Sequence, residues 1–127
     1  MEVYGTIQSG AGKGAFFMQV DWVVRQCKQM LGFVPFPGTL NIHISKNDMS
    51  KLKSLINAFD FELIPDVQGF CSAKLKKISI YDIPAAVVIP SEEVRIHDAH
   101  ILEIISPYNI KHTFRLKDGN SILLSWI

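Results

Sequence analysis

The hydrophobic residues of the chain fall mostly at every second position, in short runs separated by turn residues. The most regular run follows Pro37 and Gly38, where Leu40, Ile42 and Ile44 alternate with Thr39, Asn41 and His43. Successive side chains of a strand point to opposite faces, so this run predicts a strand with one apolar and one polar face. Comparable runs predict strands over Glu2 to Gln8, Phe16 to Met18, Phe61 to Ile64, Gly69 to Tyr81, Ala85 to Ile89, Ile101 to Ile105 and Ser121 to Ile127.

Helical spacing occurs in fewer places. An apolar stripe runs from Val20 to Leu31 and ends at Gly32, a residue typical of the position after a helix. A second helix is expected from Asn47 or Asp48 to about Ala58, and a helical turn from Ile110 to Arg115. Because short strands outnumber helices, we predict a mainly β single domain over residues 1–127, a small closed barrel with helices at its ends.

The composition excludes several classes of protein. The 127 residues are 48% hydrophobic, as in a globular domain, and the formal net charge is +1. This charge gives no argument for nucleic acid or an anionic membrane as partner. The apolar run from Ile83 to Pro90 is too short to span a bilayer, and the start of the chain does not resemble a signal peptide. Cys27 and Cys71 lie far apart, which favours two packed, reduced thiols in a cytoplasmic protein.

The polar face of the strand after Gly38 carries a candidate metal site. Thr39 and Asn41 are two residues apart on the same side, with Cα atoms roughly 7 Å apart. Their side-chain oxygens are hard, neutral ligands that could complete a Mg²⁺ shell whose negative charge comes from phosphates. The alternative is a strand with a polar, solvated face.

A glycine-rich stretch from Ser9 to Ala15 is the candidate phosphate-binding loop. Glycines at positions 10, 12 and 14 permit unusual backbone conformations and expose backbone N–H groups, which suits an anion. The spacing differs from those of the Walker A loop and the dinucleotide-binding loop. A flexible hairpin loop, with Lys13 as a solubilising charge, explains the same residues.

Glu103 is the one charge inside the apolar strand Ile101 to Ile105. A carboxylate among apolar neighbours must be paired, have a raised pKa, or lie on a polar face. Alternation puts Glu103 on the face of Ile101 and Ile105. It therefore either lies on the wall of a pocket or is an ordinary outward charge.

Several motifs occur in an order that resembles one known family. These are Ser9 to Phe17 (SGAGKGAFF), Leu31 to Phe33 (LGF), Pro35 to Asn41 (PFPGTLN), Leu102 to Pro107 (LEIISP) and Leu116 to Gly119 (LKDG). Together they cover nearly the whole chain and resemble the CTP-dependent riboflavin kinases of the archaeal type. The resemblance implies a six-stranded Greek-key barrel of the cradle-loop, RIFT-like kind, with two or three short helices.

The resemblance also implies an activity and its residues. The expected reaction transfers the γ-phosphoryl group of CTP to the 5′-hydroxyl of riboflavin, giving FMN and CDP with Mg²⁺. Thr39 and Asn41 would bind the metal, and Glu103 would contact the flavin substrate and could orient the acceptor hydroxyl or accept its proton. The nucleotide would be held by Gly10, Ala11, Gly12, Lys13, Gly14, Ala15, Tyr108, Asn109, Ile110, Lys111, His112 and Thr113.

The chain departs from the family pattern at a few positions. The flavin-binding threonine that the family carries before Glu103 is missing, and Arg95 occupies its place by offset. Lys111 stands where the family usually has arginine, and Val23 and Cys27 replace aromatic residues of the first helix. The alternative function is therefore a non-catalytic barrel that binds a flavin or a nucleotide. A nucleic-acid-binding barrel is disfavoured by the near-neutral charge.

Overall fold

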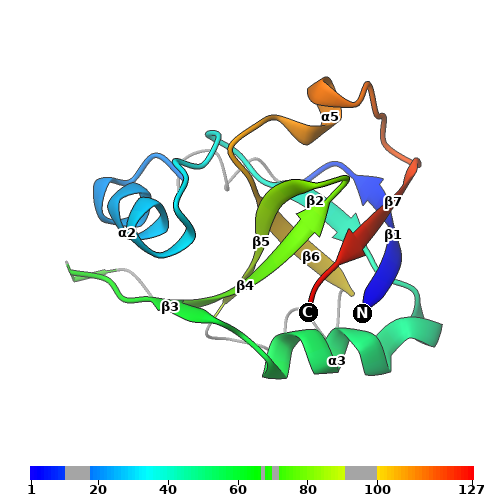
Figure 1. Cartoon of the computed structure of the whole chain (residues 1–127), viewed down its shortest axis with the longest axis horizontal. Coiled ribbons are helices and arrows are strands. Elements are labelled where there is room, and N and C mark those ends of the chain that lie inside the picture. The colour runs from blue at the N-terminus through cyan, green and yellow to red at the C-terminus, as the bar shows by residue number, and fades with distance from the viewer. Residues whose placement is uncertain (11–17, 67, 70–71, 91–99) are drawn as a thin grey trace.

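The computed structural model describes residues 1–10, 18–66, 68–69, 72–90 and 100–127. Seven strands and three α-helices are present in this part of the chain (Figure 1). In chain order, with a 3₁₀ turn η1 before α3, the elements are β1 (Glu2–Gln8), α2 (Asp21–Leu31), β2 (Leu40–His43), η1 (Lys46–Asp48), α3 (Met49–Asn57), β3 (Phe61–Leu63), β4 (Ala73–Ile80), β5 (Ile83–Pro90), β6 (Ile101–Ile105), α5 (Ile110–Thr113) and β7 (Ser121–Ser125).

The strands form the predicted closed barrel. Their order is β3-β4-β5-β6-β2-β1-β7, and a further pairing of β4 with β7, Ser79 opposite Ser125, closes the ring. Neighbouring strands are antiparallel. Six strands therefore make the barrel, as expected, while β3 extends from the free edge of β4 and lies outside the ring (Figure 1).

The barrel interior is the main hydrophobic core. Alternate residues of the strands point inward, among them Ile7, Ile42, Leu102 and Val87, each at most 1% exposed. Leu52, Leu55 and Ile56 of α3 and Ile110 of α5 join the same cluster. In Figure 1, α3 and α5 lie at opposite ends of the barrel, so each helix covers one open end.

A second core lies outside the barrel, beneath α2. Trp22, Val23 and Cys27 of this helix pack against Leu75 and Val88 on the outer face of β4 and β5. The amphipathic stripe predicted over residues 20–31 is therefore used for packing. Val23 and Cys27 are fully buried here.

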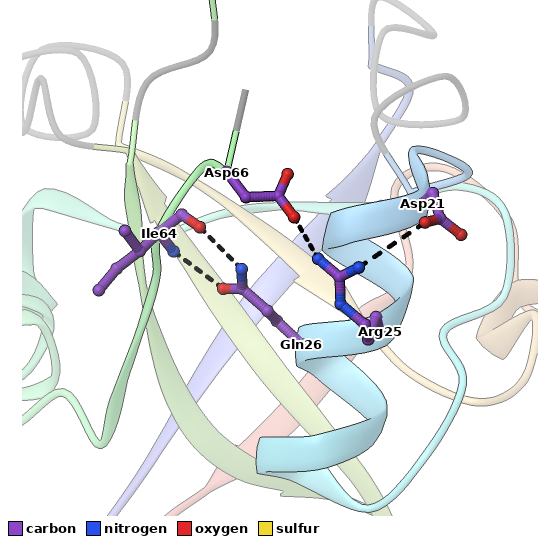
Figure 2. Close-up of polar contacts among 5 residues, drawn as sticks. All are labelled: Asp21, Arg25, Gln26, Ile64 and Asp66. Atoms are coloured by element: carbon purple, nitrogen blue, oxygen red, sulfur yellow. Dashed lines mark hydrogen bonds and ion pairs between the residues drawn. The ribbon is translucent and has the colours of Figure 1, made fainter. Parts of the chain in front are cut away.

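Polar contacts also fix α2 beside β3 (Figure 2). The side-chain amide of Gln26 donates to the carbonyl oxygen of Ile64 at 2.7 Å and accepts from its N–H at 2.9 Å. Arg25 forms ion pairs with Asp66 and with Asp21, the latter at 3.8 Å. The helix is thus held to the sheet by both its apolar and its polar faces.

Several element boundaries differ from the sequence predictions; for example, β5 begins at Ile83 where Ala85 was expected, and β7 ends at Ser125 where Ile127 was expected. Met18 lies in a turn, with its side chain in the core beneath α2, where a strand over 16–18 was expected; residues 16 and 17 are outside the described part. The strand expected from Gly69 begins at Ala73, and Gly69 itself has a φ of 95° in a turn. Thr39 precedes β2, and the last helix ends at Thr113 because Arg115 turns left-handed, with a φ of 54°. No helix within the described ranges is long and apolar enough to cross a membrane.

Cys27 should be chemically inert in the folded protein. Its thiol is fully buried, and burial raises its pKa to about 11. At pH 8 only about 0.1% of such a thiol is thiolate, the reactive form. In a Cys71→Ser variant, a thiol reagent should therefore label Cys27 only after unfolding in denaturant. Labelling of the native variant at the rate of a free thiol would contradict this packing.

Candidate functional site

A cleft lies between the segment before β2 and the segment that leads into α5. It has a volume of about 150 Å³ and is lined by Phe36, Gly38, Thr39, Tyr108, Asn109 and Lys111, among others. The backbone N–H of Phe36 donates to the carbonyl oxygen of Ser106 at 2.8 Å, which joins the two segments. Two motifs about seventy residues apart in sequence therefore form one concave surface, as a ligand site requires.

The α5 side of the cleft is held by its own hydrogen bonds. The side-chain oxygen of Asn109 accepts from the N–H of His112 at 3.1 Å and caps the helix. The carbonyl oxygen of Lys111 accepts from the N–H of Leu116 at 2.8 Å, so the chain after α5 folds back onto it. The predicted nucleotide segment, Tyr108 to Thr113, is thus one compact turn of helix beside the cleft.

Lys111 belongs to a polar network that reaches Ser9, the residue after β1. Its ammonium nitrogen lies 2.7 Å from a carboxylate oxygen of Asp118, and the other oxygen of Asp118 accepts from the hydroxyl of Ser9. Hydrogen bonds from Lys111 and Ser9 hold the pKa of Asp118 below its ordinary value. The carboxylate is therefore ionised at neutral pH, opposite the positive charge of Lys111.

Gly10 lies directly against Asn41, the second predicted metal ligand. A Cβ atom built on Gly10 would meet the side-chain Nδ2 of Asn41 at 2.2 Å and its Oδ1 at 3.0 Å. The contact at 2.2 Å is shorter than real Cβ atoms make, so a side chain at position 10 would displace the carboxamide of Asn41. The start of the glycine-rich stretch and the polar face of β2 therefore meet.

Asn41 also lies beside Glu103 on the barrel's outer face. The two residues are directly opposite in the β2–β6 pair, so their Cβ atoms are about 4.5–5.5 Å apart. Gln8 is opposite Asn41 on the other side, and Val88 is opposite Glu103. Gln8, Asn41, Glu103 and Val88 form one row across four strands, which joins the polar site to the core beneath α2.

The environment of Glu103 differs from that of an ordinary surface carboxylate. The side chain reaches solvent, yet the surrounding protein removes part of its hydration and raises the pKa of its carboxyl. Ile105 on the same face and Val88 across the strand belong to the core beneath α2. Glu103 therefore borders the buried core beneath α2 on one side and the amide of Asn41 on the other.

The donor set at Thr39 and Asn41 fits a phosphate-bound Mg²⁺ better than a metal held by protein alone. Both residues are partly buried, and their neighbours Leu40 and Ile42 point into the core, as the alternation predicts. Among the described residues no three His, Cys, Asp or Glu side chains gather as a metal cage. Neutral oxygens that leave most of the shell to phosphates and water are typical of Mg²⁺ sites.

The structure does not place every residue of the predicted site. Ala11, Gly12, Lys13, Gly14, Ala15 and Arg95 lie outside the described residues, as does Cys71. The sequence reasoning assigned no role to Ser9 or Asp118, although both lie in motifs that it singled out. Their contact joins residues 109 positions apart, and no local pattern predicts it.

Similarity to a known protein family decides between the functional classes that this geometry permits. A family model named CTP-dep_RFKase, described as "Domain of unknown function DUF120", matches residues 7–125. The chain belongs to the CTP-dependent riboflavin kinase family. The predictions of this family and of its enzyme class, a phosphotransferase, are confirmed.

Curated relatives of the family are similar over almost the whole chain. A riboflavin kinase of Saccharolobus solfataricus is 33% identical over 129 residues, covering 98% of this chain and 73% of the relative. One from Methanobrevibacter smithii is 30% identical over 123 residues, 96% of this chain and 97% of the relative. One from Archaeoglobus fulgidus is 34% identical over 130 residues, and there the chain spans 53% of the relative's length.

Proposed function

We propose that this protein phosphorylates riboflavin with CTP as donor and Mg²⁺ as metal, giving FMN and CDP. The observation that carries the proposal is the cleft that brings Thr39 of the PFPGTLN motif together with Lys111 of the expected nucleotide-binding segment. Family membership supplies the class of reaction. The cleft offers the polar and cationic groups that a nucleoside triphosphate needs.

The nucleotide would occupy the cleft beside α5. The ammonium of Lys111 would meet charge that develops on the phosphate oxygens. Residues Tyr108 to Thr113 would contact the rest of CTP, and Gly10 to Ala15 would bind the phosphates. The close approach of Gly10 to Asn41 supports this arrangement, because it puts the loop's first glycine next to the proposed metal ligands.

The metal would be held by the side-chain oxygens of Thr39 and Asn41 together with phosphate oxygens and water. When bound, Mg²⁺ neutralises negative charge on the phosphates. The protein's own contribution is to hold these two oxygens in fixed positions. The backbone of Asn41 is held by the pairing of β2 with β6, and Thr39 directly precedes that strand.

Riboflavin would approach along the outer face of the barrel, where Glu103 lies beside Asn41. The acceptor hydroxyl oxygen forms a bond to the γ-phosphorus while the bond from that phosphorus to the bridging oxygen of CDP breaks. Glu103 would orient this hydroxyl and accept its proton. Arg95 is the candidate to supply the flavin contact of the missing threonine.

The proposal is tested by incubating the purified protein with riboflavin, Mg²⁺ and each nucleoside triphosphate in turn. FMN and CDP should form in equal amounts with CTP, and FMN formation should stop when EDTA removes the metal. Tight binding of riboflavin or CTP without FMN formation would overturn the proposal in favour of a binding module. FMN formation with ATP but not CTP would overturn the donor assignment.

A further inference from the structure

Asp118 contacts two parts of the site at once, and the proposed reaction gives it no role. One carboxylate oxygen lies 2.7 Å from the ammonium nitrogen of Lys111, which lines the cleft. The other oxygen accepts a hydrogen bond from the hydroxyl of Ser9, the residue before Gly10. A single side chain thereby links α5 to the start of the glycine-rich stretch.

The turn that carries Asp118 is itself fixed to β1. The N–H of Gly119 donates to the carbonyl oxygen of Ile7 at 2.8 Å, and the N–H of Ile7 donates to the carbonyl oxygen of Asn120 at 2.9 Å. Within the turn, the side chain of Asn120 accepts from the N–H of Lys117 at 2.7 Å. The carboxylate therefore extends from a rigid support toward Lys111.

This ion pair is poorly suited to a role in stability alone. The side chains of Lys111 and Asp118 are 39% and 45% exposed, and exposed ion pairs contribute little to folding. An ammonium group has three N–H donors, so one can bind Asp118 while the others stay free for phosphate oxygens. Holding a long, flexible lysine in one direction lowers the entropic cost of binding an anion.

We propose that Asp118 is a positioning residue that directs the Lys111 ammonium into the cleft and fixes the start of the glycine-rich stretch through Ser9. The inference rests on the proposed function, since it concerns binding of the donor's phosphates. Asp118 acts through these two partners, because a carboxylate is a poor ligand for phosphate. The ionised state of Asp118 and its two hydrogen bonds agree with this role.

The test is an Asp118→Asn variant, which keeps the shape of the side chain and removes its charge. The KM for CTP should rise about tenfold, with the KM for riboflavin changed less than about twofold. The melting temperature should shift by less than about 2 °C. The matched control is Asp66→Asn, which breaks the exposed ion pair with Arg25 and should leave both KM values unchanged.

A double variant separates positioning from a general loss of structure. In a Lys111→Met background, Asp118→Asn should weaken CTP binding by clearly less than it does alone, because its main partner is already missing. Fully additive effects would overturn the proposal. So would an Asp118→Asn variant that behaves like Asp66→Asn, or one in which both KM values rise along with a lower melting temperature.

Calorimetry of CTP binding keeps this inference separate from the proposed function. If the unmodified protein binds CTP but makes no FMN, the proposed reaction is wrong. The CTP affinities of the variants then still test whether Asp118 positions Lys111. If the unmodified protein does not bind CTP at all, both proposals are overturned.

Discussion

Replacing Thr39 by valine and Asn41 by leucine should reduce Mg²⁺-dependent FMN formation by about 100-fold or more, because both neutral oxygens of the proposed metal site are removed. Each single variant should show a smaller loss that is partly relieved at high Mg²⁺ concentration. The fold should persist, since both side chains lie on the face opposite the barrel core and their core neighbours are unchanged. Initial rates over a Mg²⁺ titration measure the effect.

Asn57→Leu is the matched control for this experiment. Asn57 is the exposed last residue of α3, at the end of the barrel away from α5 (Figure 1). The same chemical change there should leave the rate and its Mg²⁺ dependence unaltered. If the Thr39 and Asn41 variants keep full turnover at limiting Mg²⁺, the metal assignment is wrong.

Glu103→Gln should lower the rate of phosphoryl transfer to riboflavin by at least about tenfold, a loss of ~1.4 kcal/mol in transition-state stabilisation. The variant keeps the shape of the side chain but loses the charge that would orient the acceptor hydroxyl or take its proton. CTP affinity should be unchanged, because Glu103 does not line the cleft beside Lys111. Single-turnover rates and calorimetry with CTP separate the two effects.

The pH dependence follows from the raised pKa of Glu103. Its carboxyl is protonated at a higher pH than an ordinary glutamate, so activity should fall on acidification through that raised pKa and be restored above it. In the Gln variant this acidic limb should disappear. Glu62→Gln, on the exposed face of β3, is the control and should keep the limb.

The free energy of unfolding should depend on the ionisation of Glu103 in the opposite direction to activity: stability decreases as pH rises, whereas activity increases. A carboxyl whose folded pKa lies above its unfolded value favours the folded state below the unfolded pKa, and this contribution is lost as pH rises through the folded pKa. The carboxylate is less well solvated in the folded protein than in the unfolded chain. Glu103→Gln should therefore not lower the melting temperature at pH 7, and a large decrease would mean that its kinetic effect reflects folding.

The strands and the two main helices could be predicted because their signals are local. In residues 39–44 the polar and apolar positions alternate, and burial alternates with them. The stripe of α2 likewise predicted which side of the helix packs. Met18 was mispredicted because tertiary contacts beneath α2, which no short window contains, decide its conformation.

The candidate site could be predicted only in part, because it depends on which strands become neighbours. Sequence reasoning found Asn41 and Glu103 separately, but the β2–β6 register that puts them side by side is a long-range property. The contacts of Asp118 with Lys111 and Ser9 likewise appear only once the chain has closed. The residue types suggested the chemistry. Only the pairing of distant segments shows that these residues lie close together.

The alternation along β2 and β6 has an evolutionary consequence. Ile42 and Leu102 point into the barrel, while Asn41 and Glu103, their immediate neighbours in sequence, point outward to the proposed site. A mutation at an outward position can change ligand preference without disturbing the packing inside. Selection can therefore act on substrate choice and on fold integrity through different residues of the same strands, so that one ancestral barrel can diversify in chemistry while its architecture is inherited intact.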